Sequence, residues 1–385
     1  MRIAIPKEIM ANERRVAATP ETVTKYRALG HEVFVEKSAG AGIYADDEAY
    51  RKAGATIVAD TASLFSGADL LLKVKQPMFN AALGRHEADM LTGASTLITF
   101  LHPASPDSHD MVRKLRDRGV TSFTMDGIPR ITRAQPMDAL TSMSTCTGYR
   151  AVLDAARHLP RFMPMLATAI GTVRPAEVLV IGAGVVGLQA IATAKRLGAI
   201  THAWDIRAAA RNDAASLGAK VDGFEIPDQV ALAPGGYAQA LTADWLARER
   251  AAIAPFVSKV DVVVCSALVP GSTAPMLVTA DMVRSMKPGA VIVDVSIDQG
   301  GNCELTEAGE EIVVQDVIVS GIQNIPGRMP VHSTWLYAEN MYRFVENLLK
   351  GGGRPDLDDE IVAGSLVTMN GRIHYKPALA VIGEN

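Results

Sequence analysis

The feature that most constrains the fold is an apolar strand pattern that runs directly into three closely spaced glycines. Glu177–Ile181 has the pattern of a buried strand, and the residues after it open a helical pattern that continues through Leu197. In such a turn the first glycine permits a tight bend, the second lets a pyrophosphate approach the backbone, and the third lets the helix pack on the strand. This order predicts a Rossmann-type unit that binds a dinucleotide. Its predicted phosphate-binding residues are Gly182, Gly184, Val185, Val186 and Gly187.

An acidic residue at the end of the following strand pattern supports this site. Asp205 follows Ile200–Trp204, about 20 residues beyond the glycines, where a carboxylate can accept hydrogen bonds from both ribose hydroxyls. The same charge repels a 2′-phosphate, so Asp205 predicts a preference for NAD(H) over NADP(H). Arg207 is a counter-signal, because an arginine at this point can hold a 2′-phosphate. A solvated arginine at the start of the next helix is the favoured interpretation of Arg207.

Length and pattern predict two domains of the α/β class. A chain of 385 residues exceeds one ordinary domain. Short β-rich runs alternate with amphipathic helical patterns almost from end to end, which is typical of parallel sheets with helical crossovers. The polar stretch over residues 129–150 departs from this alternation, and we place the crossing between domains there. The helical tail after the second series can return to the first domain.

The predicted elements fall into two series. In the first, strands are predicted over Arg2–Ile5, His31–Glu36, Asp69–Val74, Ser95–Phe100 and Val120–Met125, with helices over Pro20–Leu29 and His109–Arg118. In the second, strands are predicted over Glu177–Ile181, Ile200–Trp204, Val260–Cys265, Ala290–Val295 and Val317–Ser320, followed by a helix over Ser333–Leu349. Gly/Pro-rich loops are predicted at 233–236 and 270–275.

Composition excludes several classes of function. The net charge of −4 arises from scattered residues, so no basic patch for nucleic acid is present. The cysteines, Cys146, Cys265 and Cys303, lack the spacing of a zinc site or a disulfide framework, and we expect reduced thiols and no metal. The apolar run Phe162–Val173 is too short for a membrane span, and no export signal is visible, so we expect a cytoplasmic protein without direct membrane insertion.

Several longer motifs resemble the alanine dehydrogenase and nicotinamide nucleotide transhydrogenase superfamily over nearly the whole chain. Glu13–Pro20, the 182–187 turn and Gly300–Cys303 look like the superfamily. Further segments are similar to the NAD-binding subunit of the proton-translocating, Re/Si-specific transhydrogenases, namely Pro129–Asp138, Gly148–Arg150, Gly235–Ala238, Ala267–Gly271 and Ile325–Arg328. Alanine dehydrogenases lack the first of these segments.

The resemblance implies two Rossmann-like, doubly wound domains with a cleft between them. The first would comprise residues 1–138 and 325–385, and the second, which binds NAD(H), residues 139–324. It further implies a homodimer at the inner face of the cytoplasmic membrane. Hydride would pass directly to NADP(H) on a partner subunit, and another subunit would span the membrane.

Carried over by position, the resemblance also assigns residue roles. Arg130, Gln135 and Asp138 would shape the nicotinamide site, and Tyr237 would lie on a mobile loop that closes over the nucleotide. Other contacts to the cofactor would come from Thr141, Ile206, Arg207, Gly236, Ala267 and Leu268. Transfer between two nicotinamides moves no proton between substrates, so the protein must only bring two rings to about 3–3.5 Å and exclude water. A capped connector between domains is the competing interpretation of Arg130, Gln135 and Asp138.

Departures from the transhydrogenase pattern keep an alternative open. Thr145 stands where that pattern usually has Asn, and Ser272 where it usually has Lys. The positions that bind an oxo acid and handle its proton in alanine dehydrogenases are matched by Arg15, Lys75, His102 and Asp298. An anchoring cation and an acid suffice to reduce an imine or ketone by hydride. A stand-alone amino-acid or oxo-acid dehydrogenase is therefore the alternative, and a non-catalytic NAD-sensing module is a third.

Overall fold

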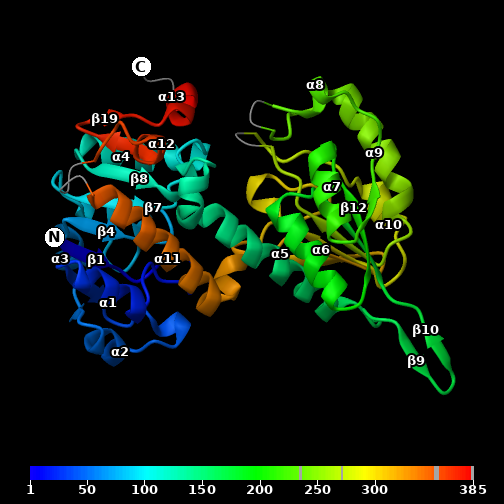
Figure 1. Ribbon diagram of the computed structural model, residues 1–385, viewed down its shortest axis with the longest axis horizontal. Helices are drawn as coiled ribbons and strands as arrows, with labels where there is room; N and C mark the ends of the chain where they lie inside the picture. The colour runs from blue at the N-terminus through cyan, green and yellow to red at the C-terminus, as the bar shows by residue number, and fades with distance from the viewer. Residues whose placement is uncertain (234–235, 270–271, 351–354, 383–385) are drawn as a thin grey trace. The chain divides into compact units, whose positions relative to one another are not determined.

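The computed structural model describes residues 1–233, 236–269, 272–350 and 355–382. The chain forms two compact units, one of residues 1–143 and 327–385 and the other of residues 144–326 (Figure 1). The first boundary lies inside α5 (Ala139–His158). The end of the chain adds β18 and β19 to the sheet of the first unit.

The sheet of the first unit is parallel apart from the strands contributed by the end of the chain. Its order is β19-β18-β8-β7-β4-β1-β2-β3. The strands are β1 (Arg2–Ile5), β2 (Glu32–Glu36), β3 (Thr56–Val58), β4 (Leu70–Leu72), β7 (Thr96–Thr99), β8 (Thr121–Thr124), β18 (Leu366–Met369) and β19 (Arg372–Ile373). From β3 to β8 neighbouring strands are parallel, whereas β18 pairs antiparallel with both β8 and β19.

Helices cover both faces of this sheet. Ile3 and Ile5 point to a core shared with α1 (Pro20–Ala28) and α11 (Pro330–Leu349), while Ala4 points to a core shared with α3 (Thr61–Ser66) and α4 (His109–Asp117). This alternation is the two-residue period of a strand that is buried on both faces. The other helices of the unit are α2 (Asp47–Lys52), α12 (Glu360–Ser365) and α13 (Lys376–Ile382). The Thr19 side chain caps α1 by accepting from the backbone N–H of Thr22.

The second unit has the strand order of a Rossmann domain. The order is β13-β12-β11-β14-β15-β17-β16. Its strands are β11 (Glu177–Ile181), β12 (Ile200–Trp204), β13 (Lys220–Asp222), β14 (Val262–Cys265), β15 (Val291–Asp294), β16 (Glu311–Val314) and β17 (Val317–Ser320). All pairs are parallel except β16 with β17. The first strand therefore lies between the second and the fourth, which is the topological switch point where such sheets bind ligands.

The core of the second unit also has two halves. One packs α5, α6 (Val185–Arg196) and α7 (Ala208–Ser216) on one face of the sheet, and the other packs α9 (Ala243–Val257) and α10 (Ala280–Arg284) on the opposite face. A short helix, α8 (Asp228–Ala231), precedes α9. The predicted α/β class with two Rossmann-like sheets is confirmed, with antiparallel strands at one edge of each sheet as the difference.

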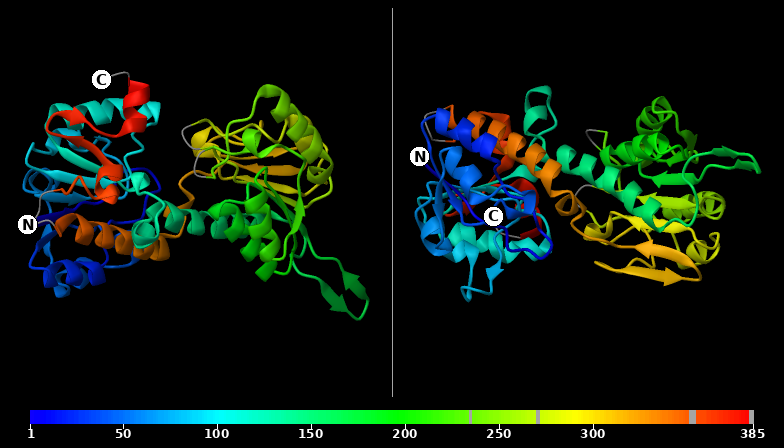
Figure 2. Two further views of the ribbon diagram at one scale, coloured as in Figure 1. Left: turned by 45° about the horizontal axis from the view of Figure 1, so that its top comes forward. Right: turned by 90° about the horizontal axis from the view of Figure 1, so that it is seen from below.

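Among the segments with structure that the patterns did not predict are the polar stretch after residue 129 and the apolar run after residue 162. The polar stretch after residue 129 contains a 3-10 helix over Thr132–Met137 and then the first half of α5. Ala139, Met143 and Cys146 are buried at helical spacing, and this burial outweighs the weak helix propensity of the intervening Ser and Thr residues. The apolar run Phe162–Val173 contains a hairpin of β9 (Leu166–Thr168) and β10 (Gly171–Val173), which projects from the second unit (Figure 2).

The described helices reach 20 residues in α5 and α11. Over the described ranges, none of them combines the length and the apolar composition needed to cross a membrane.

Candidate nucleotide-binding site

Two of the three glycines in the predicted phosphate turn are required by the chain itself. Gly182 follows β11 with φ of +90°, and a Cβ there would lie 2.7 Å from the backbone of Ala267. A Cβ at Gly187 would lie 1.9 Å from the carbonyl oxygen of Gly182. Both positions exclude any side chain because strand, turn and helix approach too closely.

The middle glycine is different. Gly184 is extended, with φ of −78° and ψ of −166°, and a Cβ built on it would meet no atom within 4 Å among the described residues. It is the N-cap of α6, and in this part of the structure no side chain caps that helix. Among the described residues, the start of α6 is thus open beside Gly184 and has no side-chain cap, and an uncapped helix start with free space beside it is the arrangement that binds phosphate. Nothing in the described fold requires glycine here, whereas an approaching pyrophosphate would.

Asp205 lies beside this turn and is almost fully buried. Its Oδ2 accepts from the backbone N–H of Ala183 at 2.8 Å and from Nη2 of Arg207 at 2.9 Å. Its Oδ1 accepts from the backbone N–H of Arg207 at 2.8 Å and from Nε of Arg207 at 3.0 Å. Arg207 stands at the start of α7 as predicted, but the interpretation of it as solvated is wrong, because its side chain is only 21% exposed and is paired with Asp205. Ile206, between them, is half-buried.

Polar residues outside the predicted set fix the loop that faces the glycine turn. Ser266 donates from Oγ to the carbonyl oxygen of Gly182 at 2.8 Å. Asn302 accepts from the N–H of Ala267 and donates to its carbonyl, both at 2.9 Å. Asp294 accepts from the backbone N–H groups of Asn302 and Cys303. Asn302 was visible in the sequence within the Gly300–Cys303 motif, but its function of holding Ala267 was not predicted.

The other predicted contacts of the second unit lie on loops. Leu268 follows Ala267 and is exposed. Gly236 has φ of +78° and is exposed, and the carbonyl of Tyr237 accepts from the N–H of Ala233 at 2.9 Å. Gly235, Pro270 and Gly271, which belong to the quoted motifs and predicted loops, lie outside the described residues.

The residues assigned to the nicotinamide loop belong to the first unit. Arg130 and Gln135 are exposed. Asp138 accepts from the backbone N–H of Thr141 at 2.9 Å and from its hydroxyl at 2.6 Å, which caps the start of α5. Asp138 and Thr141 are thus brought together. Of the two departures from the family pattern, Thr145 is half-buried on α5 and Ser272 is exposed.

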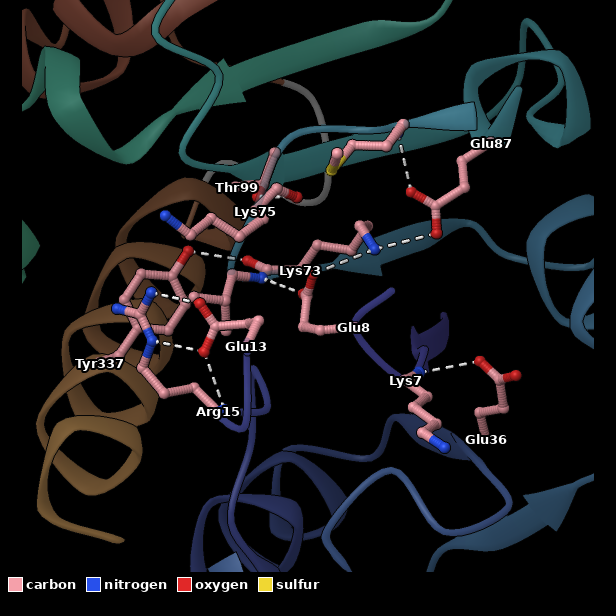
Figure 3. Close-up of polar contacts among 12 residues, drawn as sticks. Lys7, Glu8, Glu13, Arg15, Glu36, Lys73, Lys75, Glu87, Thr99 and Tyr337 are labelled. Carbon is pink, nitrogen blue, oxygen red and sulfur yellow. Dashed lines mark hydrogen bonds and ion pairs between the residues drawn. The ribbon is translucent and has the colours of Figure 1, made fainter. Parts of the chain in front are cut away.

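The residues of the alternative function lie in a different setting, and Arg15 and Lys75 of this set are shown in Figure 3. Arg15 is buried, and its Nε and Nη2 donate to Glu13 at 2.8 and 2.5 Å. Lys75 is half-buried, and its carbonyl accepts from the Thr99 hydroxyl. His102 has φ of +46° and its Nδ1 lies 3.3 Å from Oδ2 of Asp126.

Asp298, the last member of the alternative set, is exposed and belongs to the second unit. The anchor that this function needs, a guanidinium available to bind a carboxylate, is already engaged by Glu13 at two of its nitrogens.

A buried ion cluster adjoins these residues in the first unit. Nζ of Lys73 lies 3.0 Å from Glu87 and 3.3 Å from Glu8, and all three side chains are at most 2% exposed. Burial raises the pKa of Glu8, although Lys73 and the N–H of Val74 favour its charged form. The phenolic O–H of Tyr337 donates to the carbonyl of Lys73 at 2.7 Å. The polar groups of this cluster are thus occupied by one another.

Comparison with known proteins covers almost the whole chain. The N-terminal and C-terminal domain models of the alanine dehydrogenase/PNT family match residues 4–147 and 151–376. The chain is 39% identical to the NAD(P) transhydrogenase subunit alpha of Cereibacter sphaeroides, over 98% of this chain and 72% of that protein. It is 34% identical to the alanine dehydrogenase of Halomonas elongata, over 100% of this chain and 97% of that protein.

A solved structure agrees with these matches. The transhydrogenase from Sinorhizobium meliloti superposes with a TM-score of 0.84 at 39% identity, over 97% of this chain and all of that one. The resemblance inferred from the sequence is confirmed. Because both family models match and relatives more than 30% identical extend over nearly all of its length, the chain belongs to the alanine dehydrogenase/PNT family.

Proposed function

We propose that this chain binds NAD(H) at the turn from Gly182 to Gly187 and passes hydride between that nucleotide and NADP(H) on a partner subunit. The observation that carries the proposal is the open backbone at Gly184 beside the Asp205 carboxylate. This pair offers phosphate a set of amides and ribose a charged acceptor. Relatives named as transhydrogenase alpha subunits are more similar to the chain than those named alanine dehydrogenase, which favours NADP(H) over an oxo acid as the partner in transfer.

The chemistry asks little of the chain beyond placement. The bound dinucleotide supplies a hydride at its nicotinamide ring. Gly184 and the first turn of α6 would hold the phosphates, Asp205 the adenosine ribose, and the loop with Arg130 and Gln135 the ring. Exposed polar side chains on that loop suit a surface that meets another nucleotide. A 1 Å error in ring position would slow transfer by about 10²-fold.

The alternative enzyme is tested in the same assay. His102 is paired with Asp126, and a histidine held by a carboxylate is a common general acid. This pairing keeps an oxo-acid dehydrogenase as the second candidate. The purified protein is given NADH and either pyruvate with ammonium or an NADP-binding transhydrogenase subunit carrying NADP. We expect transfer only in the second case, with about 10²-fold loss in Gln135→Ala and little change in His102→Ala. Turnover of pyruvate that disappears in His102→Ala would establish the alternative instead.

The proposed assembly includes a second copy of the chain. The β9–β10 hairpin exposes apolar side chains that a monomer would leave in water, with Met165 and Ile170 62% and 101% exposed. A homodimer that covers them would be weakened by Ile170→Asp. Light scattering measures this directly, and a monomeric wild-type protein at micromolar concentration would contradict the homodimer.

A further inference from the structure

Arg207 occupies the hydrogen-bonding sites on Asp205 that a ribose would need. A carboxylate has about four acceptor positions. All four are used here, two by backbone N–H groups of Ala183 and Arg207 and two by the Arg207 guanidinium. The backbone donors belong to the turn and to the start of α7 and stay in place. Removal of the guanidinium would free two acceptor positions, which equals the number of hydroxyls that an adenosine ribose presents.

We propose that Arg207 is a specificity-determining residue that exchanges with the ribose: its guanidinium satisfies Asp205 in the free protein and leaves when the 2′- and 3′-hydroxyls bind. This inference rests on the proposed nucleotide site and adds to it. The exchange replaces one pair of donors by another, so the buried carboxylate is never left with two unfilled positions. A ribose without hydroxyls cannot make the exchange and leaves the Arg207–Asp205 pair intact.

The surroundings of Arg207 allow this movement. Its side chain is 21% exposed, whereas that of Asp205 is 5% exposed, so the guanidinium has a solvent-facing side to which it can turn. It is the N-cap residue of α7, and among the described residues no side chain caps that helix end. Arg211, one turn further along α7, donates instead to the backbone carbonyl of Asp205 at 2.8 Å. Arg207 therefore contacts the carboxylate of Asp205, whereas Arg211 contacts its backbone carbonyl, and the two arginines can be compared as a matched pair.

A cycle of two ligands and two proteins tests the exchange. The affinities of 5′-ADP and 2′,3′-dideoxy-5′-ADP are measured by calorimetry on the full-length wild type and on Arg207→Met. In the wild type the hydroxyls must displace charge-assisted hydrogen bonds, so they should improve affinity only a few-fold. In Arg207→Met they meet a carboxylate with open positions, and the ratio of the two dissociation constants should increase about tenfold. An increase of about threefold or more supports the exchange.

A smaller increase, or a decrease, overturns the proposal, because it means that Arg207 stays on Asp205 or contacts the nucleotide itself. If Arg207→Met does not fold, the same criterion applies to Arg207→Lys, which keeps the charge but lacks the paired donors. Arg211→Met is the control, and a change in its ratio as large as that of Arg207→Met also overturns the proposal. Failure of the wild type to bind either ADP or NADH would instead refute the nucleotide site on which the inference rests.

Discussion

The two units differ in the polar groups that follow the carboxyl ends of their first strands. In the first unit, β1 leads to Glu8, which is buried against Lys73 and Glu87. In the second, β11 leads through Gly182 to Gly184, which starts α6 and has open space beside it among the described residues. Both sheets are of the doubly wound type, so the architecture alone does not determine where a ligand binds. The difference is that the first unit pairs the charges of this cluster internally, whereas the second leaves the start of α6 without a side-chain cap among the described residues.

The largest expected effect is at the glycine turn of the second unit. Gly184→Val should abolish measurable NADH binding, because the side chain would enter the space through which the pyrophosphate reaches the backbone. The fold should be unchanged, since a Cβ at Gly184 has no neighbour within 4 Å among the described residues. Calorimetry measures binding and circular dichroism measures the fold.

Gly187→Ala is the matched control, a substitution at a glycine that the fold itself requires. Its Cβ would lie 1.9 Å from the Gly182 carbonyl oxygen. It should lower the free energy of unfolding by about 1–3 kcal/mol through overpacking. Normal NADH binding by Gly184→Val would place the phosphates elsewhere.

The buried ion cluster of the first unit is tested by Lys73→Met, which leaves two carboxylates buried without their cation. Removing one partner from a buried ion cluster typically lowers the free energy of unfolding by about 3–5 kcal/mol. Denaturant unfolding measures this loss. The affinity for NADH should be nearly unchanged at temperatures where the variant is folded. A stable variant with weakened NADH binding would show that the cluster belongs to the nucleotide site.

The second unit has a buried carboxyl of its own, Glu249, whose hydrogen-bond partner is neutral, unlike that of Glu8 in the first unit. Glu249 accepts from the indole N–H of Trp204 at 3.1 Å, and burial raises its pKa to about 7. Between about pH 4.5 and 7 the unfolded chain loses this proton while the folded chain keeps it, so stability should fall as pH rises through that window. The fall is up to about 3 kcal/mol. Thermal unfolding of Glu249→Gln should show this contribution removed, and an unchanged pH profile would contradict it.

Asp205→Asn should have a smaller effect on nucleotide binding than Gly184→Val. The ribose would lose its charged acceptor, but displacement of the Arg207 guanidinium already offsets most of that gain in the wild type, so NADH binding should weaken only a few-fold while the preference over NADPH relaxes. Titration of both nucleotides into both proteins tests this. NADPH binding as tight as NADH binding in the wild type would refute the function assigned to Asp205.

Residues with strong local signals were predicted from the sequence, and those fixed by distant partners were not. Glu177–Ile181 and Ile200–Trp204 have the predicted strand bounds, because their apolar patterns and flanking glycines are local. The helix over 139–158 was missed, since burial of Ala139 and Met143 in a core formed with segments remote in sequence decides it. The pairing of Arg207 with Asp205 was missed too. The sequence separation between the glycines and Asp205 predicts that the acid contacts a ribose, but it does not show which residue pairs with the acid in the absence of nucleotide.

Amide hydrogen exchange with and without NADH tests the contrast between the two units most directly, because it maps binding on the unaltered protein. We predict slower exchange at residues 183–187 and 205–207 when NADH is bound. Residues 8, 13–15 and 73–75 of the first unit, whose polar groups are already paired, should show little change. Protection of the first unit's cluster without protection of the glycine turn would contradict the account.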